Sequence, residues 1–231
     1  LELAHADDYA ATLAAALPRH ALSDLDTPER ELAWLDDLHV HGVAVVTGVS
    51  PDVAGLCGVA ERIGVMEATN YGPSHWQIVT NRDPVNQVDA DGALRVHSDL
   101  PYRMLPPGLQ LLMPTVATAS GGLTKLVDGH HVAALIHRED PDAFHLLTTV
   151  DRAFAYVADG QSYVGGGPPI GLRDGRPHVL RHAPDLVLAP RGGDPAAVDR
   201  AYRVLVDTAA RPELEFRLRL EPGELLSLIH I

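Results

Sequence analysis

A histidine and an aspartate lie two residues apart at His97 and Asp99, within "RVHSDLPYRMLPPGLQLL" (95–112). In an extended strand, side chains at positions i and i+2 point to the same face, so these two would project together while Ser98 points away. Fe(II) accepts imidazole nitrogen and carboxylate oxygen, and a site of two histidines and one carboxylate leaves adjacent positions open for other ligands. The pair could therefore supply two of the three protein ligands of such a site.

The spacing alone leaves several interpretations open. Short His-x-Asp pairs occur often by chance, and this one could be a polar pair at the mouth of a sheet. A zinc hydrolase could use the same residues as two of its three ligands. A cupin-like or jelly-roll binding module could retain the barrel without catalysis. Dependence on a co-substrate would separate these classes.

The composition limits the classes of molecule that this protein can bind. The chain has 231 residues, is 46% hydrophobic and carries a net charge of −13 without a block of Lys or Arg, so it would repel nucleic acid and anionic membranes. Its single cysteine, Cys57, excludes an internal disulfide and a cysteine-rich zinc site. The sequence shows neither an apolar run of membrane-spanning length nor a signal-peptide start. We expect a cytoplasmic protein that acts on a small molecule.

The elements that must position the pair begin with an N-terminal segment, residues 1–65, that contains predicted helices and a strand. Thr27 and Pro28 predict a helix that ends at Gly42, "VAVVTGV" (43–49) predicts a buried strand, and Ser50 with Pro51 predicts the start of a second helix. We expect residues 1–65 to belong to the same single domain, 1–231, as the rest of the chain.

From about residue 77 the sequence favours short strands. Apolar runs punctuated by Gly, Pro and Asp are typical of a sandwich or barrel. The runs are "LQLLMPTV", "LTKLV", "AFAYV", "DLVLA" and "LEFRLRL". Asp140-Pro141 and Asp194-Pro195 predict two helices between them, and "VGGGPPIG" (164–171) predicts a loop.

Five motifs resemble one enzyme family in the same order along the chain. They are "TNYG" (69–72), "HSDLPYRMLPPGLQLL" (97–112), "GGLTKLVDG" (121–129), "DPDAFHLLTT" (140–149) and "EPGELL" (221–226). The chain resembles the TauD-like Fe(II)/2-oxoglutarate dioxygenases, in the branch of gamma-butyrobetaine hydroxylase and trimethyllysine dioxygenase. The resemblance implies a mainly β fold with flanking helices, a double-stranded β-helix (jelly roll), and His97 and Asp99 as the first two iron ligands.

The resemblance also implies residues for the co-substrate. Thr124 follows Asp99 by about 25 residues in a GG-x-[ST] stretch, where its hydroxyl would bind the distal carboxylate of 2-oxoglutarate. Composition alone favours the other interpretation, in which Thr124 is a β-branched strand residue after a glycine turn, and only the resemblance reverses that order. Asn86 lies where relatives carry an asparagine near the co-substrate, although it could be a turn former.

An aromatic cage for a trimethylammonium group is implied in this branch through cation–π attraction. Tyr71 and Trp76 resemble two of its walls, and the alternative is a packed aromatic pair. Asp89 stands where a cage tyrosine would fall and could pair with a cation. "VLRHAPD" replaces an Asn-Asn pair that would bind a substrate carboxylate. These departures leave the substrate open.

The implied activity is hydroxylation of a small substrate, such as gamma-butyrobetaine or a relative, as in carnitine biosynthesis. The implied cofactors are Fe(II), 2-oxoglutarate and O2, with ascorbate as a reductant, and a homodimer is compatible with the sequence. Asp99 disfavours the halogenating variant, in which that carboxylate is vacated for chloride.

The C-terminal residues concern the expected position of the third metal ligand, a second histidine. In the family, the second iron-binding histidine follows the glycine of the "PGD" turn, here Gly223, by roughly a dozen residues, so it should lie beyond Ile231. His230 comes too early, and the slip needed to use it would change the face of the strand. We therefore expect a jelly roll that is incomplete at its C-terminus, with little activity.

Overall fold

The computed structural model describes residues 9–70, 72, 75–78, 94–116, 122–158, 160–190 and 192–230. The helices are α1 (Tyr9–Ala16), α2 (Pro28–His41), α3 (Val53–Ile63), α4 (Gly129–Glu139), α5 (Pro141–Thr149) and α6 (Pro195–Ala209), with short 3-10 turns η1 (Leu22–Asp26) and η3 (Pro212–Leu214). The strands are β1 (Arg19–Ala21), β2 (Val43–Thr47), β3 (Leu109–Leu112), β4 (Leu123–Leu126), β5 (Arg152–Ala158), β6 (Gln161–Gly167), β7 (Ile170–Arg173), β8 (Arg176–Leu180), β9 (Phe216–Arg219) and β10 (Glu224–Ile229).

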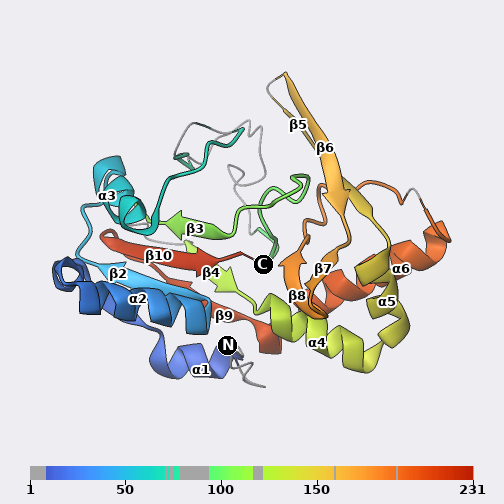
Figure 1. The fold of residues 1–231 in the computed structure, drawn as a ribbon, viewed down its shortest axis with the longest axis horizontal. Coiled ribbons are helices and arrows are strands. Elements are labelled where there is room, and N and C mark those ends of the chain that lie inside the picture. Colours follow the sequence, from blue (N-terminus) through green and yellow to red (C-terminus); the bar gives the residue numbers. More distant parts are fainter. Residues whose placement is uncertain are drawn as a thin grey trace.

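The largest sheet has the strand order β1-β2-β10-β3, with β1 parallel to β2 and β10 antiparallel to both neighbours. Its two faces bury alternate residues of β2. Ala44 and Val46 pack with Trp34 of α2 and Val59 of α3, whereas Val45 packs on the opposite face. Figure 1 shows α2 and α3 beside this sheet.

The second face of that sheet lines the barrel interior. There Val45 and Leu226 pack against Leu218 of β9, which pairs with β4. In β10, Leu226 is opposite Leu112 and Leu228 is opposite Gln110. Because side chains alternate along a strand, Gln110 faces the same interior as Leu112.

The other half of the molecule contains the β5–β6 and β7–β8 hairpins together with α4, α5 and α6. They share a core that includes Ile136, Phe154 and Leu205. Figure 1 shows β5–β6 rising above the rest of the molecule, while β10, in red, runs toward the middle. Within the described ranges, no helix combines the length and apolar character needed to cross a membrane.

Most predicted helix boundaries are confirmed by their caps. The α2 helix begins after Thr27 and ends at Gly42, whose φ of 70° is the left-handed conformation that glycine adopts readily. Asp140 and Asp194 cap α5 and α6 with their carboxylates. The predicted start of the next helix at Ser50 is wrong: α3 begins at Val53, because Asp52 accepts a hydrogen bond from the amide of Gly55.

The loop predicted for 164–171 is also wrong. These residues include the end of β6 and the start of β7, and β6 pairs with β5 along its whole length. A Cβ on Gly166 would lie 1.9 Å from the carbonyl oxygen of Arg152. The glycines therefore permit close strand pairing. The predicted strand "DLVLA" is reduced to a single bridge between Val187 and Phe154.

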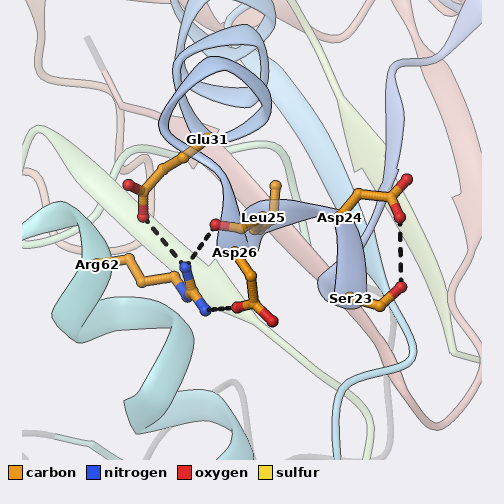
Figure 2. Close-up of polar contacts among 6 residues, drawn as sticks. All are labelled: Ser23, Asp24, Leu25, Asp26, Glu31 and Arg62. Carbon is orange, nitrogen blue, oxygen red and sulfur yellow. Dashed lines mark hydrogen bonds and ion pairs between the residues drawn. The ribbon is translucent and has the colours of Figure 1, made fainter.

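Arg62 connects the N-terminal helices α2 and α3 to each other and to η1. The Arg62 guanidinium on α3 donates to the carbonyl oxygen of Leu25 at 2.7 Å, to Asp26 at 2.7 Å and to Glu31 at 3.4 Å. Figure 2 shows these three acceptors converging on Arg62 from η1 and α2. The contacts hold α3 beside α2 on the outer face of the large sheet.

Candidate active site

The structure brings the side chains of His97 and Asp99 together. Nε2 of His97 lies 3.3 Å from Oδ1 of Asp99, and the two side chains are 36% and 28% exposed, so both can be reached by a ligand. Nδ1 of His97 lies 2.8 Å from the carbonyl oxygen of Arg95. Since a carbonyl only accepts, Nδ1 carries the proton, and Nε2 can offer its lone pair once it is deprotonated.

The backbone that positions this pair is irregular, which corrects the strand predicted at 97–99. The amide of Ser98 donates to the carbonyl of His182 at 2.7 Å, and the amide of His182 donates to Oγ of Ser98 at 2.9 Å. The chain then turns at Leu100, with a φ of 49°. Hydrogen bonds between Ser98 and the backbone of His182, rather than strand pleating, hold the segment.

Two further residues complete a hydrogen-bonded ring around Asp99. The side-chain amide of Gln110 donates to Oδ2 of Asp99 at 2.6 Å, and its Oε1 lies 3.1 Å from Nε2 of His230. The backbone amide of Asp99 donates to Nδ1 of His230 at 3.3 Å. His230 therefore reaches the predicted site, with both ring nitrogens engaged in hydrogen bonds.

The charges in this group are coupled. The hydrogen bond to Asp99 raises the pKa of His97 against the opposing effect of burial. Burial alone would raise the pKa of Asp99, but His97 and His230 outweigh it and lower that pKa. Burial lowers the pKa of His230. Without a metal, a proton between His97 and Asp99 is therefore favoured, and a cation must compete with it.

The other predicted site residues are only partly described. Thr124 is half-buried on β4, opposite Leu218, and lines the same open cavity as His97, Asp99 and Trp76. Trp76 is 36% exposed. The remaining three predicted residues, Tyr71, Asn86 and Asp89, lie outside the described residues.

The donor chemistry of the pair fits one metal ion. Two neighbouring ligands about 2.1 Å from a metal, at a right angle, lie about 3.0 Å apart, close to the 3.3 Å observed between Nε2 of His97 and Oδ1 of Asp99. Across the part of the chain that the structure describes, no three His, Cys, Asp or Glu side chains are arranged to hold a metal. The geometry thus provides two adjacent ligands.

Sequence reasoning missed two residues next to the pair, Gln110 and His182. Gln110 could have been found, because it is a polar residue at an interior position of the apolar strand "LQLL". His182 is 4% exposed, and burial lowers its pKa to about 4. Among the residues that the structure describes, its Nδ1 has no hydrogen-bond partner. Its contact with Ser98 depends on the fold and leaves no local pattern in the sequence.

Solved structures show the same fold. A putative alpha-ketoglutarate-dependent taurine dioxygenase from Burkholderia xenovorans superposes with a TM-score of 0.64 at 13% identity, covering 88% of this chain and 74% of that one. AAD-2 in complex with Mn(II) and N-oxalylglycine gives a TM-score of 0.62 at 14% identity, covering 92% and 84%. The predicted jelly-roll fold is confirmed.

Curated relatives are similar in sequence. Trimethyllysine dioxygenase, mitochondrial, from Gallus gallus is 29% identical over 213 residues, which are 88% of this chain and 51% of that protein. Gamma-butyrobetaine dioxygenase from Pseudomonas sp. (strain AK-1) is 30% identical over 198 residues, 84% and 51%. The human gamma-butyrobetaine dioxygenase is 32% identical over 121 residues, 52% and 31%. The chain spans about half the length, or less, of these relatives.

The family assignment rests on nearly the whole chain. The model of the taurine catabolism dioxygenase TauD, TfdA family matches residues 7–228. This span includes every predicted site residue except His230. The sequence resemblance is thus confirmed, and the chain belongs to the TauD/TfdA dioxygenase family.

Proposed function

We propose that this protein is an Fe(II)- and 2-oxoglutarate-dependent dioxygenase that hydroxylates a small molecule. The observation that carries the proposal is the pairing of Nε2 of His97 with Oδ1 of Asp99, 3.3 Å apart at an open cavity. Membership of the TauD/TfdA family supports the same chemistry. When bound, Fe(II) and 2-oxoglutarate would supply the oxidation that inserts an oxygen atom from O2 into a C–H bond.

The residues of the chain would bind and orient the reactants. His97 would bind the metal through Nε2 because Nδ1 donates to Arg95, and Asp99 would bind through Oδ1 because Oδ2 accepts from Gln110. Thr124, on the same cavity, would donate its hydroxyl to the distal carboxylate of 2-oxoglutarate. Asn86 is proposed as a second contact to the co-substrate.

For the substrate we propose a trimethylammonium compound such as gamma-butyrobetaine or a relative. The names of the similar dioxygenases support this class. Trp76, exposed at the cavity, would offer a ring face to the cation, with Tyr71 as a second wall and Asp89 as a counter-charge. A place in carnitine biosynthesis would follow from this substrate.

We propose the domain organisation, compartment, reductant, assembly and partner class on the same grounds. A single domain in the cytoplasm would use ascorbate as a reductant and could assemble as a homodimer. The net charge of −13 supports a small-molecule partner rather than nucleic acid or an anionic membrane. His230 is not proposed as a metal ligand, since the described residues hold no three ligating side chains arranged around one metal ion.

The test is anaerobic mixing of Fe(II) and 2-oxoglutarate with a longer form of the protein that carries the second metal-binding histidine expected from the sequence. We expect a visible charge-transfer band that disappears in His97→Ala and in Asp99→Ala, since each variant loses a metal ligand. His178→Ala is the matched control, because His178 is an exposed histidine on the same cavity. An undiminished band in either ligand variant would show that the metal assignment is wrong.

Turnover separates the proposed enzyme from a binding module. Decarboxylation of 2-oxoglutarate in the presence of O2 supports the dioxygenase, whereas metal and ligand binding with no turnover supports a non-catalytic jelly roll. Activity with Zn²⁺ and no requirement for 2-oxoglutarate would instead support a zinc hydrolase.

The proposed substrate class is tested at Trp76. Because a cation–π contact contributes about 0.5–2 kcal/mol, Trp76→Leu should weaken binding of a trimethylammonium ligand by that amount. Binding of the neutral isostere, in which a tert-butyl group replaces the cation, should change little. Calorimetry with both ligands measures the difference, and equal losses would indicate simple packing.

A further inference from the structure

We propose that Gln110 is a positioning residue that orients the carboxylate of Asp99, so that one oxygen is held and the other is available to a cation beside His97, and that it couples this carboxylate to the end of β10. This inference rests on the proposed function, since it concerns the metal held by His97 and Asp99. It adds a residue from a third segment, the strand β3, to the pair predicted from sequence.

The directions of the hydrogen bonds around Gln110 are fixed by chemistry. The backbone amide of Asp99 can only donate, so Nδ1 of His230 must accept from it. In the neutral imidazole, Nε2 of His230 then carries the proton and donates to Oε1 of Gln110. The amide nitrogen of Gln110 in turn donates to Oδ2 of Asp99 at 2.6 Å. The ring begins and ends at Asp99.

This ring leaves the two oxygens of Asp99 inequivalent. Oδ2 accepts from Gln110, whereas Oδ1 faces Nε2 of His97. Because the two oxygens of a free carboxylate are chemically equivalent, a half-turn of the carboxylate restores the same arrangement, whereas a smaller rotation would break the hydrogen bond from the Gln110 amide. Gln110 thus favours a monodentate carboxylate with its free oxygen beside the imidazole.

A neutral amide suits this task better than a charged donor. Lys or Arg at the same position would pair with Asp99 and cancel the negative charge that attracts a cation. The amide of Gln110 orients the carboxylate and leaves that charge in place. One side chain also supplies both the donor to Asp99 and the acceptor for His230, which neither Glu nor Met can do.

The position of Gln110 on β3 also supports a role at the site. Gln110 is opposite Leu228, and its strand neighbours are Leu109 and Leu111. A half-buried polar side chain between apolar neighbours is costly unless it is hydrogen-bonded. Here the hydrogen bonds of Gln110 are directed at Asp99 and His230, not at the core.

The experiment compares two substitutions on one strand. In Gln110→Met the side chain keeps its length and loses both hydrogen bonds, whereas Leu111→Met changes the neighbouring residue on the opposite face, which packs with α2 and α3. Binding of Mn²⁺ to the metal-free chain is measured by electron paramagnetic resonance, with N-oxalylglycine present. We expect Q110M to bind Mn²⁺ about tenfold more weakly and L111M to match the unaltered chain.

A second readout requires no metal and no variant. Nitrogen NMR of the unaltered chain at a pH where His230 is neutral should show the proton on Nε2, as the ring requires. A proton on Nδ1 in the unaltered chain would overturn the proposal even if Q110M failed to fold.

The outcomes distinguish the two proposals. Equal Mn²⁺ affinity in the unaltered chain and Q110M would overturn the role of Gln110 and leave the proposed function standing. If Mn²⁺ binds neither the unaltered chain nor a longer form that carries the second metal-binding histidine expected from the sequence, the metal-binding function fails, and the role of Gln110 toward a cation fails with it.

Discussion

Ser98 acts on the predicted metal pair through the backbone. Its Oγ accepts from the amide of His182 at 2.9 Å, and its own amide donates to the His182 carbonyl at 2.7 Å. These bonds fix the residue that lies between His97 and Asp99. The side chain is 8% exposed, so water cannot readily replace the Oγ contact.

Replacing Ser98 with alanine should therefore destabilise the fold. The substitution leaves the buried amide of His182 without a partner, which costs about 1–3 kcal/mol in the free energy of unfolding. Ser98→Thr retains an acceptor oxygen and should retain most of that stability. Urea denaturation measures the effect, with Ser162→Ala, an exposed serine on β6, as the control. A Ser98→Ala variant as stable as this control would contradict the argument.

The imidazole of His182 should make the fold sensitive to acid. Burial lowers the pKa of His182 from 6.5 to about 4, so the unfolded chain takes up a proton at a higher pH than the folded chain does. The stability of the folded state is therefore complete above pH 6.5 and falls as the pH drops toward 4. The loss from this one group reaches about 3 kcal/mol by pH 4.

The substitution His182→Asn tests this dependence, because asparagine does not titrate. Between pH 7 and pH 4 the free energy of unfolding of this variant should fall by about 3 kcal/mol less than that of the unaltered chain. His178→Asn, an exposed histidine on β8, serves as the control and should follow the unaltered chain. Chemical denaturation at several pH values measures both slopes. Parallel slopes for the His182 variant would refute the assignment.

At the scale of secondary-structure elements, the glycines of β6 allow this strand to approach neighbouring backbone closely. A Cβ on Gly165 would lie 2.2 Å from the carbonyl oxygen of Tyr102, in the turn that follows Asp99. Tyr102 in turn stacks on Tyr163 of β6, with ring centroids 5.7 Å apart. The absence of a side chain at Gly165 lets the β5–β6 hairpin approach this turn.

Gly165→Ala should force the hairpin and the turn apart. Because the contact atom belongs to the backbone, we expect a loss of about 1–3 kcal/mol in the free energy of unfolding and weaker metal binding at Asp99. Gly58→Ala in α3 is the control, since a Cβ there meets nothing within 4 Å and alanine favours a helix by about 0.5–1 kcal/mol. Thermal denaturation of Gly165→Ala and Gly58→Ala measures the difference in stability between these variants. The argument fails if Gly165→Ala is as stable as the unaltered chain.

Elements with local signals could be predicted from the sequence, and those set by distant contacts could not. Caps such as Asp140 and Asp194 lie next to the helices they begin, so α5 and α6 were predictable. The glycines of β6 indicated a loop because their close contact, with β5 and Tyr102, is invisible locally. The motif His97-x-Asp99 identified the pair for the same reason as the caps. The hydrogen bonds between Ser98 and His182 and from Gln110 to Asp99 join residues far apart in the sequence, so no local pattern could predict them.

At the scale of the whole molecule, the candidate site joins its two halves. Gln110 and His230 come from the large sheet, whereas His182 follows β8 in the half that contains α4, α5 and α6. The segment with His97 and Asp99 is bonded to both sides. A ligand at this position would therefore stabilise contacts across the molecule and not only one element.

Metal binding should consequently raise the stability of the entire fold. A cation that binds only the folded chain increases the free energy of unfolding by about 2.7 kcal/mol at a concentration 100 times its dissociation constant. We expect the melting temperature to rise with Mn²⁺ concentration and to return to its starting value when a chelator is added. His97→Ala should abolish the rise, while His178→Ala on the same cavity should retain it. Differential scanning calorimetry over a series of Mn²⁺ concentrations measures the slope. An equal slope in His97→Ala would place the bound metal elsewhere, whereas a rise confined to one of two separate transitions would show that the halves unfold independently and that the site does not couple them.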